Sequence, residues 1–253
     1  MAMGMEREGE GEGEGEEKAP LVMHDHEHQA KRIPAGAPVT NTTTKTKPAL
    51  RGVSHQAACV GSAMAGVALI RAAPEGKITV SVAVYAASLV CLFGVSAVYH
   101  RITWTPEQRR IARRVDHAAI FVLIAGTYTP IATVALQGPA ADACLALVWS
   151  LCLAGVGLSV FWPDAPKALV AFICVAYGCA GAWEWSSFAA GLSHAEVALI
   201  ASGGALYAVG AWAYAARRPD PWPLTFGYHE VFHALTIAAT ACHFAAIWLL
   251  ATR

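Results

Sequence analysis

Charged residues are scarce in most of this 253-residue chain. The two signs balance, with 18 Lys and Arg against 18 Asp and Glu, so we expect no nucleic-acid partner. Residues 1–52 carry 16 of these 36 charges, which leaves 20 among the 201 residues from Val53 onward. Soluble domains average about 25% charged residues. With 56% hydrophobic residues, this chain cannot cover a water-facing surface. We therefore exclude an ordinary soluble protein and expect the body of the chain to lie in a membrane.

The chain also lacks the marks of a disulfide-rich secreted protein. Its seven cysteines lie singly in apolar stretches and form no CxxC pair, which favours buried free thiols. No basic start followed by an apolar run is present, so we expect no cleavable signal peptide. The chain opens instead with an alternation of Glu and Gly from Glu6 to Glu17.

The first 48 residues have little to bury. The Glu/Gly alternation is followed by scattered prolines and a threonine-rich run over residues 40–46. Such a composition cannot offset the entropy lost on ordering. We therefore predict a disordered acidic tail over residues 1–48 and a transmembrane domain over residues 49–253.

The transmembrane domain contains apolar runs long enough to cross about 30 Å of hydrocarbon. Only helices or closed barrels satisfy their backbone in lipid, and runs of this length are helices. We predict an all-α fold, an integral membrane bundle of seven transmembrane helices. Six helices are the alternative, because the fifth and sixth runs are separated only by Ser193, His194 and Glu196. The predicted spans are residues 53–70, 78–99, 115–136, 143–161, 168–192, 195–214 and 228–251.

Basic residues orient this predicted bundle. If the tail lies inside the cell, nearly all Lys and Arg residues of the loops also face the cytosol, and only Arg71, Lys77 and Arg253 lie outside. This asymmetry follows the positive-inside rule and predicts a cytosolic amino terminus. The inner set comprises Lys45, Lys47, Arg51, Arg101, Arg109, Arg110, Arg113, Arg114, Lys167, Arg217 and Arg218.

Ionisable side chains inside the spans indicate a functional site, because they are costly in a membrane. Alternating spans bring three groups of them to the cytosolic end at similar depth. A catalytic zinc is typically bound by several imidazoles with a carboxylate nearby. We therefore predict a metal site built from His100, Asp116, His229 and His233; the alternative is that each histidine only forms interfacial hydrogen bonds. The three groups are Ser96 with His100, Asp116 with His117, and His229 with Glu230 and His233.

Residues 229–233 match HExxH, the zinc-protease motif in which the glutamate acts as base. Such a protease needs a further ligand downstream, and His243 lies about 15 Å deeper along the same helix. We expect His243 either to form a hydrogen bond inside the bundle or to belong to a second site, and His100 is the better third ligand. This favours a zinc architecture unlike that of the proteases. His55 and Gln56 are expected at the same depth in the membrane as the predicted metal site, and we assign them a structural role.

Four segments together resemble a known family. They are residues 47–52 with His55, residues 96–100, Asp116 with residues 126–130, and residues 227–233 with His243. In these segments the chain resembles the hemolysin III family, within the progestin and adipoQ receptor group that includes the adiponectin receptors. The resemblance covers residues 47–251 and leaves out the acidic tail. The ordered combination of SxxxH, Asp and HxxxH is specific.

This resemblance implies a seven-helix bundle with a zinc ion near its cytosolic face. The family's zinc ligands correspond to His100, His229 and His233, and Asp116 corresponds to the aspartate that holds the zinc-bound water. Ser96 corresponds to a neighbouring serine. The wider group includes ceramide-cleaving amidases, whereas hemolysin III members are mostly assigned as channels, pore formers or receptors.

Three functions remain open from the sequence. The first is a zinc-dependent hydrolase of a lipid amide or ester, in which Asp116 moves a proton and Ser96 orients a ligand or steadies the oxyanion. The second is a non-enzymatic receptor or sensor whose zinc is structural. The third is a pore, for which only Glu184 is available inside a span away from the site; its neighbours Trp183 and Trp185 favour an interface anchor instead.

Overall fold

The computed structural model describes residues 47–253, so the predicted tail, apart from its last two residues, lies outside the described part of the chain. Seven helical segments are long and apolar enough to span a membrane, which confirms the predicted fold class. The fifth of these segments, Lys167–Gly191, is interrupted, and its parts carry separate labels. The elements are α1 Val53–Ala72, α2 Lys77–Arg101, α3 Pro106–Ala135, α4 Pro139–Phe161, α5 Lys167–Gly178, the 3-10 turn η1 Ala182–Glu184, α6 Trp185–Gly191, α7 His194–Ala216 and α8 Tyr228–Thr252.

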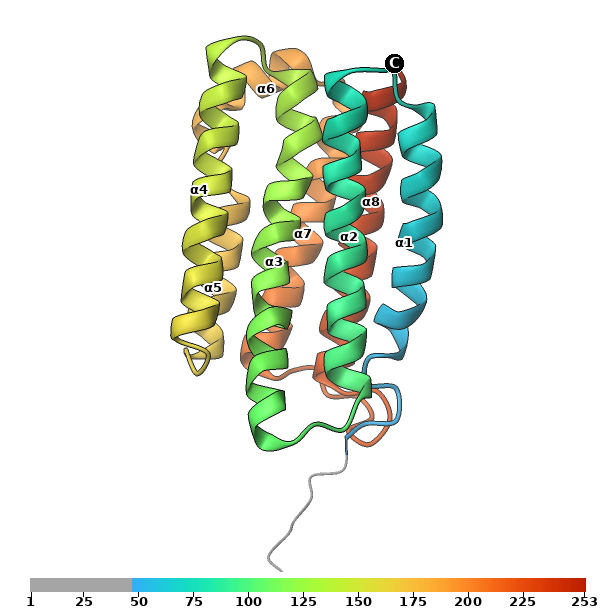
Figure 1. Cartoon of the computed structure of the whole chain (residues 1–253), viewed down its shortest axis with the longest axis vertical. Helices are drawn as coiled ribbons and strands as arrows, with labels where there is room; N and C mark the ends of the chain where they lie inside the picture. The colour runs from blue at the N-terminus through green and yellow to red at the C-terminus, as the bar shows by residue number, and fades with distance from the viewer. Residues whose placement is uncertain (1–46) are drawn as a thin grey trace, which may run out of the picture. The chain divides into compact units, whose positions relative to one another are not determined.

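The helices run side by side and pack mainly on their sequence neighbours (Figure 1). Helix α2 contacts α1 and α3, helix α7 contacts α5 and α8, and α8 also contacts α1, α2 and α3. The α2–α3, α4–α5 and α7–α8 connections all lie at one end of the bundle, the lower end in Figure 1. This end, called the histidine end below, therefore carries the end of α2 and the starts of α3 and α8.

Helix α3 begins at Pro106, nine residues before the predicted start. Thr105 accepts a hydrogen bond from the Gln108 backbone N–H, and the Gln108 side chain accepts one from the Thr105 N–H. This reciprocal cap, with Pro106 in the first turn, is a strong start signal for a helix. The prediction of a loop through the arginine-rich segment was therefore wrong, and its side chains project from helical positions.

The fifth span differs from the predicted continuous helix at residues 168–192. Helix α5 ends at Gly178, and Tyr128 of α3 fills the break that follows. Its hydroxyl donates to the Gly178 carbonyl at 2.6 Å and accepts from the Gly181 N–H at 3.1 Å. A broken helix is tolerated in a membrane where protein groups satisfy the freed backbone. Tyr128 provides this satisfaction from another helix.

The weakly marked boundary before the sixth span is present in the structure. Ser193 caps α7 by accepting from the Glu196 N–H, and the Glu196 carboxylate accepts from the Ser193 N–H at 2.6 Å. The polar residues that interrupt the apolar run thus start a new helix. This boundary favours seven spans over the alternative of six.

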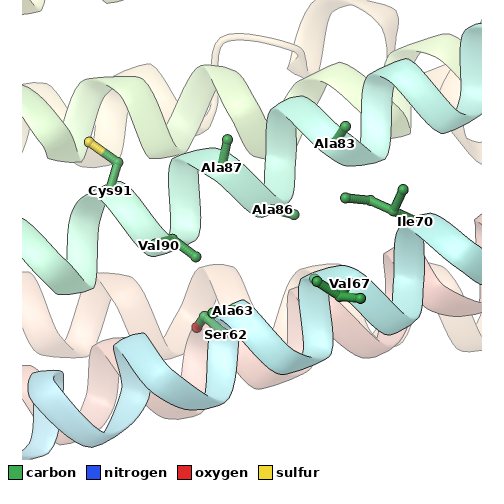
Figure 2. Close-up of a pocket in the computed structure, with 10 residues that line it drawn as sticks. Ser62, Ala63, Val67, Ile70, Ala83, Ala86, Ala87, Val90 and Cys91 are labelled. Atoms are coloured by element: carbon green, nitrogen blue, oxygen red, sulfur yellow. The ribbon is translucent and has the colours of Figure 1, made fainter.

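An apolar groove of about 540 Å³ runs between α1 and α2 (Figure 2). Small side chains line much of it, and Gly66 of α1 lies against Ala86 of α2, where an added Cβ would come within 2.8 Å of the alanine Cβ. Close helix packing in membranes commonly relies on such small residues. Gly66 follows His55 by eleven residues, or about 16 Å of helix, so this close contact lies away from the histidine end.

Candidate metal centre

Within residues 47–253, one group of side chains has the spacing of a metal site: His100, His229 and His233. One ligand atom from each of the three lies within 4.8 Å of the others. His100 comes from the last turn of α2, and the other two lie one turn apart at the start of α8. All three side chains are at most 9% exposed. The structure thus brings together the three histidines that the sequence singled out.

The spacing of two of the imidazoles suits a tetrahedral ion. The Nε2 atoms of His100 and His229 are 3.2 Å apart. Two nitrogens of a tetrahedral zinc site are separated by about 3.3 Å, given Zn–N bonds of about 2.0–2.1 Å. The buried Nδ1 of His233 has no hydrogen-bond partner, so this ring has a nitrogen available for an ion. The donor set therefore fits Zn²⁺.

His55 of α1 joins the group as a fourth ring. It stacks on His233 with 3.7 Å between ring centroids and 13° between planes, and its Nδ1 lies 2.8 Å from the Ser96 hydroxyl. The structural role predicted for His55 is consistent with this position, because the stacking fixes the orientation of the His233 ring. From the sequence, only the depth of His55 in the membrane could be predicted. Its stacking on His233 depends on how α1 packs against α8.

Asp116 of α3 lies beside the Ser96 hydroxyl and does not belong to the group of three histidines. No ion pair joins it to a cation in the described part of the chain. Ser96 therefore connects two side chains, His55 on one side and Asp116 on the other. Of the two predicted catalytic residues, Ser96 thus contacts His55 and Asp116 contacts Ser96, and neither belongs to the group of three histidines.

Glu230, the glutamate of the HExxH match, is already engaged. Its side chain is 2% exposed and forms an ion pair with Arg51. Its other oxygen accepts the Gly227 N–H at 2.9 Å and so caps α8. A carboxylate held in this way is not available as a base, which agrees with the rejection of the zinc-protease interpretation.

The segment 47–52 crosses the histidine end of the bundle. Its backbone donates from Ala49 to the Leu224 carbonyl and from Leu50 to the Thr225 carbonyl, at 2.9 and 3.2 Å. Gly52 has a φ of +80°, and a Cβ there would come within 2.8 Å of the His100 Cβ. Glycine is therefore needed both for the backbone conformation and for the close approach to the site.

His243 stays outside the candidate site, as predicted. Its Nε2 lies 3.2 Å from the Ile200 carbonyl of α7, and its ring packs beside Tyr207 at 5.5 Å between centroids. The predicted hydrogen bond inside the bundle is confirmed.

Comparison with known proteins identifies the family. The family model described as "Haemolysin-III related" matches residues 43–244. The chain is 32% identical to a hemolysin-3 homolog of Bacillus subtilis, over 65% of this chain and 74% of that protein. It is 25% identical to the human monocyte to macrophage differentiation factor, over 65% and 68% of the two chains. It is also 26% identical to a rice heptahelical transmembrane protein, ADIPOR2, over 64% and 78%.

The matched region contains all seven spans and the three histidines, apart from the last turns of α8. The resemblance that the motifs indicated is confirmed, and the chain belongs to the haemolysin-III related family of heptahelical membrane proteins.

Proposed function

We propose that this protein is a zinc-dependent hydrolase that cleaves an amide or ester bond of a membrane lipid, such as a ceramide-type amide. One observation carries the proposal: three buried imidazoles converge within 4.8 Å inside a membrane bundle. The carboxylate of Asp116, which lies beside Ser96, has no ion-pair partner in residues 47–253. Three protein ligands that leave a fourth position open are typical of catalytic zinc, whereas structural zinc sites are closed by four.

His100, His229 and His233 would hold the ion. When bound, Zn²⁺ polarises a substrate carbonyl and lowers the pKa of a coordinated water to about 7. Such a site requires neutral imidazoles. The stacked ring of His55 keeps His233 in place.

Asp116 would accept the proton of the attacking water and return it to the leaving amine or alcohol. It can do so because no cation in the described residues neutralises it by an ion pair. Ser96 would orient Asp116 through its hydroxyl, which also meets His55. Asp116 is therefore assigned to proton transfer and Ser96 to positioning, and neither is assigned as a ligand of the ion.

The test is an Asp116→Asn variant, purified in mild detergent with its metal content measured. We expect the metal to be retained and hydrolysis of lipid amides and esters to fall at least a hundredfold, since general acid–base catalysis contributes roughly 10²–10⁴-fold. Asp142→Asn, in the first turn of α4 at the opposite end of the bundle, is the matched control. Unchanged turnover in Asp116→Asn would refute the assigned role.

We also propose that the histidine end faces the cytosol. All the described Lys and Arg residues except Arg71, Lys77 and Arg253 lie in or next to the connections at this end, along with the segment that leads into α1. Under the positive-inside rule, the amino terminus would therefore lie in the cytosol. Labelling of an added cysteine at Glu75, in the α1–α2 connection, by an impermeant reagent on intact cells tests this orientation.

A receptor with a structural zinc is the second candidate, and the position of the ligands favours it. His100 and His229 belong to helices far apart in the chain, so an ion would join α2 to α8. Loss of thermal stability without any hydrolytic activity, after metal removal, would support this candidate. The pore alternative gains no support from Glu184, which lies in the turn η1 and accepts a hydrogen bond from Ser187.

A further inference from the structure

A second apolar groove, of about 350 Å³, lies on the outer surface of the bundle between α2 and α3. Its walls include Val98 and Val115, both 49% exposed, which indicates that the groove opens away from the core. In a membrane this surface faces lipid tails. Apart from Trp104 and Tyr99, its lining consists of Gly94, Val95, Val98, Ala112 and Val115.

Polar and cationic groups gather at the end of this groove. The Trp104 indole donates to the Tyr99 carbonyl at 3.1 Å, and the Arg109 guanidinium lies over the Tyr99 ring, 5.7 Å from its centroid. The Lys47 ammonium donates to the Ile102 carbonyl in the α2–α3 connection at 3.2 Å. Trp and Tyr side chains at such positions mark the level of lipid headgroups.

Neither of these two cations is neutralised by an ion pair in the described part of the chain. No ion pair joins Lys47 or Arg109 to a carboxylate within residues 47–253, although Glu107 lies on the same turn of α3 as Arg109. Partial burial lowers the pKa of Lys47, and repulsion from Arg109 and Arg51 lowers it further. An anion placed between these groups would relieve the repulsion.

We propose that the α2–α3 groove binds an anionic phospholipid of the bilayer, with an acyl chain along the groove and the phosphate against Arg109 and Lys47. The groove supplies the apolar part of the site, and the unbalanced cations at its end supply charge complementarity. This lipid site is separate from the histidines and does not depend on the proposed hydrolase. Tyr99 is near both, since its ring centroid lies 5.7 Å from the Arg109 guanidinium and 4.6 Å from the centroid of the His100 ring.

The charge is tested by native mass spectrometry of the detergent-purified full chain, titrated with phosphatidylglycerol or with phosphatidylcholine of the same acyl chains. We expect phosphatidylglycerol to bind more tightly, and Arg109→Gln to weaken its binding about fivefold, the effect of one basic residue near a membrane surface. Arg110→Gln is the matched control, because it removes the same charge but points about 100° away around the helix. Circular dichroism verifies that both variants are folded.

The groove is tested by Ala112→Leu, which adds a larger side chain to its lining, with Ala87→Leu in the α1–α2 groove as the control. Only the first should weaken binding of phosphatidylglycerol. Equal binding of the two lipids, or equal losses from Arg109→Gln and Arg110→Gln, would overturn the proposal. Displacement of the lipid by soluble glycerol phosphate at equal concentration would identify a free anion as the occupant and overturn it. A dimer that dissociates in Ala112→Leu would identify a second copy as the occupant, with the same consequence.

Discussion

Replacing Arg51 by Met should destabilise the bundle strongly, because it leaves a buried carboxylate without its cation. Glu230 is 2% exposed, whereas Arg51 is 21% exposed. After the change, the Gly227 N–H is the remaining hydrogen-bond donor to Glu230 among the described residues. Breaking a buried pair in this way costs about 3–5 kcal/mol. We expect a loss near the lower figure, since Arg51 is partly exposed.

The reverse change, Glu230→Gln, should cost much less. The Gln side chain can still accept the Gly227 N–H and cap α8, and Arg51 can turn toward solvent. We expect a loss of about 1 kcal/mol, the usual worth of one hydrogen bond. The double variant should be more stable than Arg51→Met alone, because it leaves no buried charge.

The assay is reversible unfolding in mixed detergent micelles, followed by circular dichroism, for both single variants and the double variant. Arg113→Met is the matched control, because its partner Asp164 is 79% exposed and such pairs contribute about 0–1 kcal/mol. Equal losses for Arg51→Met and Arg113→Met would refute the reasoning. So would a larger loss for Glu230→Gln than for Arg51→Met.

Two further changes test the local structure. Gly52→Ala should lower the free energy of unfolding by about 2 kcal/mol and weaken metal binding, because a left-handed Ala is unfavourable by roughly 1–2 kcal/mol and its Cβ would press on His100. Unfolding measures the first effect and zinc titration the second. An unaltered zinc affinity would show that the segment 47–52 does not position the site. Tyr128→Phe should cost about 1–3 kcal/mol, because the Gly178 carbonyl and the Gly181 N–H lose their shared partner. An unfolding free energy equal to that of the wild type would show that water or lipid headgroups satisfy the break instead.

Much of the architecture follows from the sequence because length and apolarity decide which segments cross a membrane. The start of α3 did not follow in this way. Its capping signal, Thr105 with Pro106 and Gln108, lies in a segment whose density of arginines indicated a loop. The signal was present in the sequence, and local capping geometry outweighed charge.

The break in the fifth span could not be predicted in the same way. The run over residues 168–192 is apolar throughout much of its length, and glycines alone do not break a membrane helix. The break depends on Tyr128, which reaches it from a helix about fifty residues earlier. Such tertiary contacts leave no local pattern.

The candidate site, too, could be predicted from the sequence only in part. His100, His229 and His233 could be grouped in advance, because alternating helices fix which ends share a side of the membrane. The engagement of Glu230 by Arg51 and the stacking of His55 on His233 depend on how α1 packs, which periodicity does not determine. The sequence therefore supplied the three potential ligands and little of what surrounds them.

The central claim is that α2 and α8 share one zinc ion. Zinc content per chain should be measured on protein purified in mild detergent for the wild type, His100→Ala and His233→Ala, with His243→Ala as the control outside the group. We predict close to one zinc per chain in the wild type and in His243→Ala, and little in the other two. Absence of zinc from the wild type, or equal zinc in all four proteins, would contradict the account.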